Sequence, residues 1–174
     1  IFPWYIDEYN YIHWFSPQKR MIIKPEEMKV SKSLKKSVLN KGFVIKSNEN
    51  FEAVMRNCSN IKRKHEDSTW ISEEFIQAYT DLHHLDIAFS IECYLDEELV
   101  GGLYGLLIGD VFCGESMFAK VTDASKVAFY HLCQQAEKNG IKLIDCQVYN
   151  DHLASLGAYE ITREDYFKIL KESF

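Results

Sequence analysis

Hydrophobic positions follow two spacings along the chain, which predicts helices and strands in one mixed α/β fold. Residues 88–94 and 99–108 are rich in aliphatic and aromatic side chains on either side of an acidic turn, and they predict paired strands followed by a further strand over 111–113. Apolar residues at helical spacing predict a helix that Asp123 caps and Gly140 ends. The same reasoning predicts a hairpin over 4–14, a strand over 43–46, and helices over 33–41, 50–57, 73–84 and 162–171.

Residues 141–148 form a short aliphatic run between turn residues, which predicts a buried strand. Side chains alternate along a strand, so Asp145 and Gln147 are expected to look outward together while Cys146 packs in the core. A second polar group, Glu115, stands in the apolar stretch 112–118. Buried polar groups must either find partners or take part in chemistry, and the spacing leaves both interpretations open.

Length and composition indicate a globular protein of one domain, or of one domain with a small appendage. The chain has 174 residues, of which 47% are hydrophobic, and it contains no apolar run of the roughly 20 residues that a membrane-spanning helix needs. Five widely spaced cysteines without a C-x-x-C pair argue against a disulfide framework or a zinc site. We therefore expect a cytoplasmic protein with no metal. The sequence starts at Ile1 rather than at Met, which leaves open whether a further segment precedes it.

The net charge of −6 hides a basic segment. Between Gln18 and Lys64 there are 13 Lys or Arg against 4 Glu, and seven aromatic residues crowd the first fifteen positions. Such a patch can neutralise phosphates, and exposed rings can stack on unpaired bases, although a solvated helix surface and an aromatic packing cluster would give the same pattern. The change in composition near residue 65 predicts a boundary between a domain of residues 1–64 and one of residues 65–174.

Several blocks of sequence, in order over nearly the whole chain, resemble the bacterial leucyl/phenylalanyl-tRNA-protein transferases. These blocks are residues 1–4 (IFPW), 14–17 (WFSP), 68–71 (STWI), 98–105 (ELVGGLYG), 112–118 (FCGESMF), 124–126 (ASK), 143–152 (LIDCQVYNDH) and 157–158 (GA). Family members usually carry a further stretch before the Phe-Pro-Trp block. The resemblance therefore leaves open whether the small N-terminal domain is complete or truncated here.

The resemblance implies an α+β, GNAT-like acyltransferase fold, a mixed and largely antiparallel sheet flanked by helices, behind a small N-terminal α/β domain. The implied reaction moves Leu or Phe, and by extension Met, from aminoacyl-tRNA to the α-amine of a protein that begins with Arg or Lys, which creates a degradation signal of the N-end rule. The resemblance implies no cofactor, and we expect a monomer.

The resemblance also assigns roles to individual residues. Asp145 and Gln147 would be the catalytic pair. The residues implied to bind substrate are Trp4 and Trp70 for the terminal adenosine, Leu103, Met117 and Phe129 for the transferred side chain, and Gly114, Glu115 and Asn150 close to the reaction centre. Lys32 and Lys36 would contact tRNA.

The chemistry of these residue types is compatible with those roles. The donor ester is already activated, so the enzyme must mainly bring an unprotonated amine to it and stabilise the oxyanion. Asp145 could accept a hydrogen bond from the amine, and Gln147 could hold the amine or the carbonyl. Glu115 could pair with the acceptor's cationic side chain or with the donor's own α-amine, and both remain open. Leu103 and Phe129 could equally be plain core residues.

Two other functions compete with this interpretation. A CoA-dependent N-acetyltransferase would share the fold, but it needs a glycine-containing loop at a helix N-terminus for the pyrophosphate, and residues 118–122 contain no glycine. A non-catalytic module that grips tRNA or basic N-termini would bind its ligands without any transfer.

Overall fold

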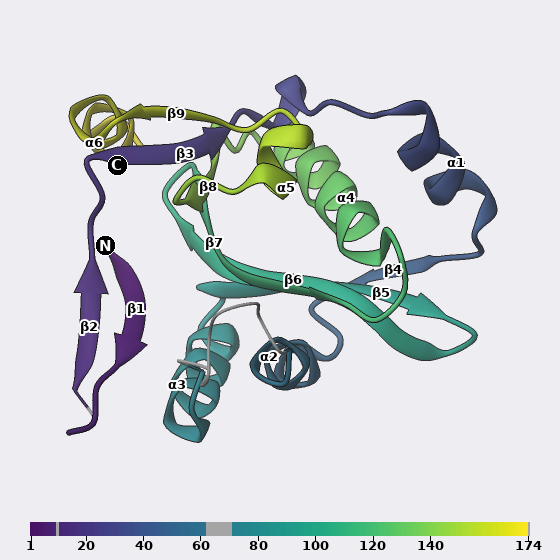
Figure 1. The fold of residues 1–174 in the computed structure, drawn as a ribbon, viewed down its shortest axis with the longest axis horizontal. Coiled ribbons are helices and arrows are strands. Elements are labelled where there is room, and N and C mark those ends of the chain that lie inside the picture. Colours follow the sequence, from purple (N-terminus) through teal and green to yellow (C-terminus); the bar gives the residue numbers. More distant parts are fainter. Residues whose placement is uncertain (10, 62–70, 174) are drawn as a thin grey trace.

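The computed structural model describes residues 1–9, 11–61 and 71–173, and its centre is a seven-stranded sheet (Figure 1). Among the described strands, all neighbours in this sheet pair antiparallel except β7 and β8, which are parallel. The expected mixed, largely antiparallel sheet is therefore confirmed. Across the sheet the strands are β4 (Val44–Ser47), β5 (Ala88–Leu95), β6 (Glu98–Ile108), β7 (Val111–Ala119), β8 (Leu143–Gln147), β3 (Lys19–Ile23) and β9 (Tyr159–Thr162).

Helices cover both faces of the sheet. The long helix α4 (Ala124–Lys138) crosses one face, with α1 (Lys32–Asn40) and the short 3-10 helix η1 (Pro25–Glu27) beside it. On the opposite face lie α2 (Phe51–Ser59) and α3 (Glu73–His84) (Figure 1). Each face has its own hydrophobic core, one beneath α4 and one beneath α2 and α3. No helix of the described residues is both long and apolar enough to cross a membrane.

The N-terminal segment forms a separate two-stranded hairpin of β1 (Phe2–Ile6) and β2 (Ile12–Phe15), as the sequence predicts. Two strands were not predicted, β3 and β9, and β7 extends to Ala119 rather than ending at Cys113. Strands β3 and β4 precede residue 65 and belong to the same sheet as the later strands. The division into residues 1–64 and 65–174 as folding units stays a prediction.

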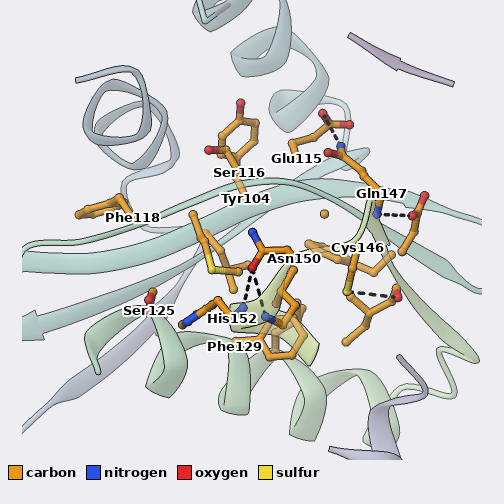
Figure 2. A pocket seen from close by; sticks show the side chains of 18 of the residues that line it. Tyr104, Glu115, Ser116, Phe118, Ser125, Phe129, Cys146, Gln147, Asn150 and His152 are labelled. Carbon is orange, nitrogen blue, oxygen red and sulfur yellow. Dashed lines mark hydrogen bonds between the residues drawn. The ribbon is translucent and has the colours of Figure 1, made fainter. Parts of the chain in front are cut away.

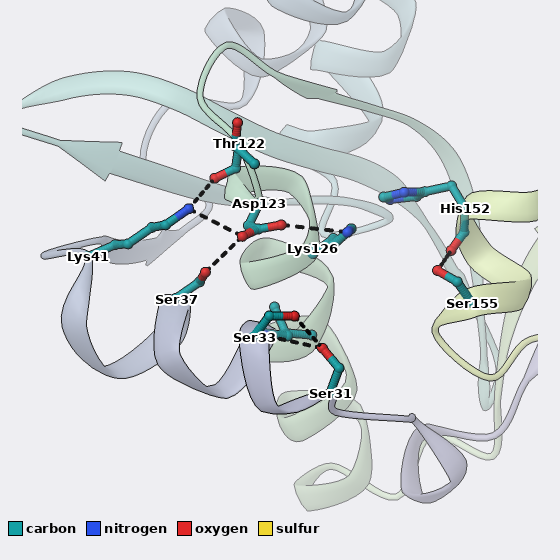
Figure 3. Close-up of polar contacts among 10 residues, drawn as sticks. Ser31, Ser33, Ser37, Lys41, Thr122, Asp123, Lys126, His152 and Ser155 are labelled. Atoms are coloured by element: carbon teal, nitrogen blue, oxygen red, sulfur yellow. Dashed lines mark hydrogen bonds and ion pairs between the residues drawn. The ribbon is translucent and has the colours of Figure 1, made fainter.

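Most of the expected helix starts are confirmed, but Asp123 does not cap α4 with its side chain. Asp123 has a left-handed backbone (φ +73°), and its carboxylate instead accepts a hydrogen bond from Ser37 Oγ at 2.8 Å and pairs with Lys41 Nζ at 3.2 Å (Figure 3). The hydrogen bond from Ser37 is the main reason why the pKa of Asp123 is lowered. Asp123 therefore joins α1 to the start of α4. By contrast, Ser72 accepts from the backbone N–H of Phe75, as a capping residue does.

Glycines in β6 allow other backbone segments to approach closely. A Cβ on Gly101 would lie 2.5 Å from Ala124 Cβ, because the first turn of α4 packs directly on this strand. At Gly105 the pairing with β7 shifts register, and a Cβ there would lie 2.3 Å from Cys113 O. The regular pairing of β6 with β7 is therefore interrupted at Gly105, and α4 is held against the sheet at its N-terminus.

The only parallel pairing among the described strands is short, and this creates the site. β7 and β8 pair over Val111–Cys113 and Leu143–Asp145, and beyond these residues the two strands separate. The chain leaves β8 into α5 (Asp151–Ser155), returns as β9 and ends in α6 (Arg163–Lys171). An opening therefore forms in the sheet between residues 114–119 of β7 and the end of β8.

Candidate active site

A cavity of about 610 Å³ fills the opening between β7 and β8 (Figure 2). Strands β6 and β7 line one side of it, and α4, the end of β8 and the start of α5 line the other. The structure brings nine of the predicted site residues to this cavity: Trp4, Leu103, Gly114, Glu115, Met117, Phe129, Asp145, Gln147 and Asn150.

One wall of the cavity is apolar. Leu103 and Met117 stand opposite each other on β6 and β7, and Phe129 and Leu132 reach the cavity from α4. Leu103 and Phe129 also belong to the core beneath α4. The sequence left open whether they are core residues or pocket residues, and in the structure they are both. A wall of this composition suits an apolar side chain that is aromatic or has no branch at Cβ, and one methylene more or less would change its binding by only about 1–3 kcal/mol.

The other end of the cavity carries a carboxyl and an amide in contact. Gln147 Nε2 lies 3.5 Å from Glu115 Oε2 (Figure 2). Burial, and after it the negative charge of Asp145, raises the pKa of Glu115 to about 7, although a hydrogen bond from the hydroxyl of Tyr79 acts in the opposite direction. Glu115 is therefore close to half ionised at neutral pH, and a cation brought into the cavity would favour its charged form.

Asp145 does not look out of the strand beside Gln147, so this expectation is wrong. Its side chain is 0% exposed and is paired with the buried Arg20, whose Nε and Nη2 donate to the two carboxylate oxygens at 2.7 and 2.5 Å. The hydroxyl of Tyr166 and the backbone N–H of Gln147 donate the remaining two hydrogen bonds, at 2.7 and 2.8 Å. A carboxylate offers about four acceptor positions, and the protein fills four.

The backbone conformation of Gln147 explains why the side chains of Asp145 and Gln147 do not point in the same direction. Gln147 has φ +67°, a left-handed conformation that costs a non-glycine residue of order 1–3 kcal/mol unless its surroundings hold it there. The hydrogen bond from its N–H to Asp145 Oδ1 is such a restraint. Strand alternation ends at this residue, and the Gln147 amide turns toward Glu115 (Figure 2).

Asn150 and His152 complete the wall of the cavity where α5 begins. The side-chain oxygen of Asn150 caps α5 by accepting from the backbone N–H groups of His152 and Leu153, so its amide nitrogen is left to face the cavity (Figure 2). His152 Nε2 is buried without a hydrogen-bond partner among the described residues, and burial lowers the pKa of this ring.

The aromatic and basic residues predicted to hold RNA have different placements. Trp4 projects from the β1–β2 hairpin to the cavity and is 47% exposed, as a ring that receives a ligand would be. Trp70 lies outside the described residues. Lys32 and Lys36 are exposed on α1 and do not line the cavity. Among the described residues, no group of three His, Cys, Asp or Glu could hold a metal ion.

Sequence reasoning missed the residues that surround Asp145. Arg20 of β3 lies 125 positions from Asp145 and Tyr166 of α6 lies 21 positions from it, while the missed Tyr79 of α3 donates to Glu115. One signal existed, because Arg20 opens the aliphatic run RMII, where a buried cation requires an anionic partner. The identity of that partner depends on a pairing across 125 positions.

The chain matches a family model over most of its length. The model for leucyl/phenylalanyl-tRNA protein transferase matches residues 22–171. Curated proteins with this name are similar over nearly the whole chain: one from Flavobacterium johnsoniae is 51% identical over 98% of this chain and 80% of its own length, and one from Nitrosospira multiformis is 49% identical over 99% and 73%.

Solved structures with little sequence identity share the fold. FemX superposes with a TM-score of 0.64 at 11% identity, over 90% of this chain and 65% of its own. A GCN5-related N-acetyltransferase from Kribbella flavida gives a TM-score of 0.51 at 12% identity, over 83% and 54%. The predicted GNAT-like fold is therefore confirmed. Together with the family model and the curated relatives, the separated strands and their cavity identify the chain as a member of the leucyl/phenylalanyl-tRNA protein transferase family.

Proposed function

We propose that the chain transfers Leu or Phe, and more slowly Met, from aminoacyl-tRNA to the α-amine of proteins that begin with Arg or Lys. The acceptor would thereby gain an N-terminal degradation signal, and the enzyme would act in the cytoplasm as a monomer without a cofactor. The observation that carries the proposal is the combination, in one cavity, of an apolar wall with the Glu115–Gln147 pair.

The donor is proposed to bind by its two ends. The Leu or Phe side chain would occupy the apolar wall of Leu103, Met117 and Phe129, and the terminal adenosine would stack on Trp4, with Trp70 as a second ring. Base–aromatic stacking is worth about 1–3 kcal/mol per base and needs an exposed ring, which Trp4 has. Gly114 has no side chain, and this leaves room near the ester between these two ends.

The reaction itself requires positioning more than bond activation. The amine nitrogen of the acceptor forms a bond to the ester carbonyl carbon, the bond from that carbon to the ribose oxygen breaks, and the amine proton is passed to this oxygen. Gln147 is proposed to donate a hydrogen bond to the ester carbonyl oxygen as this oxygen gains negative charge. The Asn150 amide lines the same cavity and is proposed as a second donor to this oxygen. Asp145 would act through Gln147, because its own acceptor positions are filled.

Glu115 is proposed to bind the cationic side chain of the acceptor rather than the donor's α-amine. Its carboxylate is already in contact with the Gln147 amide, so a guanidinium or ammonium bound to it would bring the acceptor's amine toward the same group. Charge-assisted hydrogen bonds of this kind are roughly twice as strong as neutral ones. This pairing would explain a preference for Arg or Lys at the acceptor N-terminus.

The experiment uses the purified protein, Leu-tRNA labelled in its leucyl group, and peptides that begin with Arg or with Ala. We expect label on the Arg peptide, far less on the Ala peptide, and no acetylation when acetyl-CoA replaces Leu-tRNA. The Asp123 carboxylate stands at the N-terminus of α4, where it would repel a pyrophosphate. Acetyl transfer from acetyl-CoA, or binding of Leu-tRNA without any transfer, would contradict the proposal.

Lys32 and Lys36 are proposed to contact tRNA phosphates from the exposed face of α1. Replacing both with Ala should weaken Leu-tRNA binding and reduce the slope of log K against log salt by about 1.4–1.8, the release expected for two phosphate contacts. The measurement is a salt titration of the dissociation constant. Ala at the exposed Lys168 and Lys171 of α6 is the control, and an unchanged slope for the Lys32 and Lys36 variant would remove these residues from the RNA surface.

A further inference from the structure

Arg20 is a buried cation in contact with three different parts of the molecule. Its guanidinium binds both oxygens of Asp145 in β8 and contacts two rings, 4.5 Å from the centre of Phe2 in β1 and 4.8 Å from that of Tyr166 in α6. Arg20 is 4% exposed and does not line the cavity. Any effect of Arg20 on the reaction must therefore pass through its neighbours.

One path from Arg20 leads to Trp4. Phe2 is buried against the guanidinium and contacts the Trp4 ring edge-on, with 5.9 Å between ring centres. Phe15 on β2 contacts both of these rings, at 5.9 Å from Phe2 and 5.3 Å from Trp4. The hairpin forms its own two-stranded sheet, so packing of this kind fixes where its rings stand relative to the main sheet.

The other path leads to Gln147. Arg20 and Tyr166 hold the Asp145 carboxylate, and that carboxylate accepts the N–H of Gln147 and supports its left-handed backbone. The planar guanidinium can make both bidentate hydrogen bonds and ring contacts at once, which a lysine ammonium cannot do in the same geometry. Trp4 and Gln147, which both line the cavity, therefore share one anchor.

We propose that Arg20 is a positioning residue that sets Trp4 and Gln147 relative to each other, and so aligns the stacked end of the donor with the amide at the transfer centre. This inference rests on the proposed function. The two paths act on different steps: the path through Phe2 governs donor binding, and the path through Asp145 governs the rate of transfer once both substrates are bound. A displacement of about 1 Å at a reaction centre can cost on the order of 100-fold in rate.

Three variants separate the two paths in the transfer assay with Leu-tRNA and the Arg peptide. Phe2→Leu keeps an apolar side chain but loses the ring contacts, and it should raise KM for Leu-tRNA by about threefold or more with little change in kcat. Tyr166→Phe keeps the ring over Arg20 but loses the hydrogen bond to Asp145, and it should lower kcat by about tenfold with little change in KM. Arg20→Lys keeps the charge but loses the paired hydrogen bonds to Asp145 and the flat contacts with the two rings. It should therefore lower kcat and raise KM for Leu-tRNA together.

The matched control is Arg56→Lys, because Arg56 also binds a carboxylate with two nitrogens, that of Glu73, but outside the cavity. It should leave both constants unchanged. A merely structural role of Arg20 would reduce the folded fraction, and with it the apparent kcat, without moving KM. That result, or Phe2→Leu and Tyr166→Phe variants that affect the same constant, would overturn the inference. Absence of transfer by the unmodified protein would instead contradict the proposed function.

Discussion

Asp145→Ala is expected to abolish transfer and to lower the free energy of unfolding by about 3–5 kcal/mol, because it leaves the buried Arg20 without its counter-charge. Tyr166 and the N–H of Gln147 lose their acceptor at the same time. Urea denaturation and the transfer assay measure the two effects. Asp151→Ala is the control, since Asp151 is exposed on α5 and its side chain accepts an exposed hydrogen bond from Tyr149.

The loss of activity in Asp145→Ala does not by itself separate an anchor from a catalytic base, so a double variant is needed. Asp145→Asn combined with Arg20→Gln removes both buried charges, and the new amide oxygen can still accept the N–H of Gln147. We expect this double variant to regain most of the free energy of unfolding that Asp145→Ala loses. Its single-turnover rate should be at least about tenfold higher than that of Asp145→Ala. A stable double variant with no more transfer than Asp145→Ala would favour a direct role for the carboxylate.

Glu115→Gln is expected to lower kcat/KM for Arg-starting peptides at pH 8 by at least about 30-fold, because losing one partner of a buried charge pair costs about 2–5 kcal/mol. The pH dependence should change as well. Burial raises the pKa of Glu115 to about 7, so its charged form increases as pH rises through 7. The acceptor's α-amine, with a pKa near ~8, also becomes unprotonated in this range.

Both the Glu115 carboxyl and the acceptor's α-amine must lose a proton before transfer, so kcat/KM should rise more steeply with pH than if one group alone had to lose a proton. Below pH 7 the logarithm of kcat/KM for the Arg peptide should rise with a slope near ~2 in the unmodified protein and near ~1 in Glu115→Gln. The measurement is this profile between pH 5.5 and 9, with KM for Leu-tRNA as the control quantity. If the variant instead raises KM for Leu-tRNA and keeps the steeper profile, Glu115 binds the donor's α-amine.

Local signals in the sequence predicted most of the helices and the central strands. Ser72 and Thr162 cap the helices expected after them, and β5 and β6 flank the acidic turn as predicted. Strands β3 and β9 were missed because their positions depend on pairing with each other and with β8, which lies 120 or more residues beyond β3. Asp123 looks like a cap in the sequence, but contacts with Ser37 and Lys41 from α1 decide the direction of its side chain.

The sequence predicted which residues line the candidate site better than it predicted the directions of their side chains. Leu103 and Met117 face each other across β6 and β7, and Glu115 lines the same cavity at the register shift between these two strands. The positions of Asp145 and Gln147 could not be predicted from alternation, because the backbone of Gln147 is left-handed. The partner that buries Asp145 is 125 residues away, and a single sequence contains no signal for that contact.

Transfer in this cavity depends most directly on Gln147 standing at the transfer centre, and one rate constant tests this. In a single-turnover experiment with saturating Leu-tRNA and Arg peptide, Gln147→Ala should transfer leucine about 100-fold more slowly than the unmodified protein, as expected for loss of one donor to a developing oxyanion. Binding of Leu-tRNA should stay the same, and Gln135→Ala, at an exposed hydrogen bond of a residue that does not line the cavity, should match the unmodified protein. An unchanged rate in a correctly folded Gln147→Ala protein would contradict transfer in this cavity.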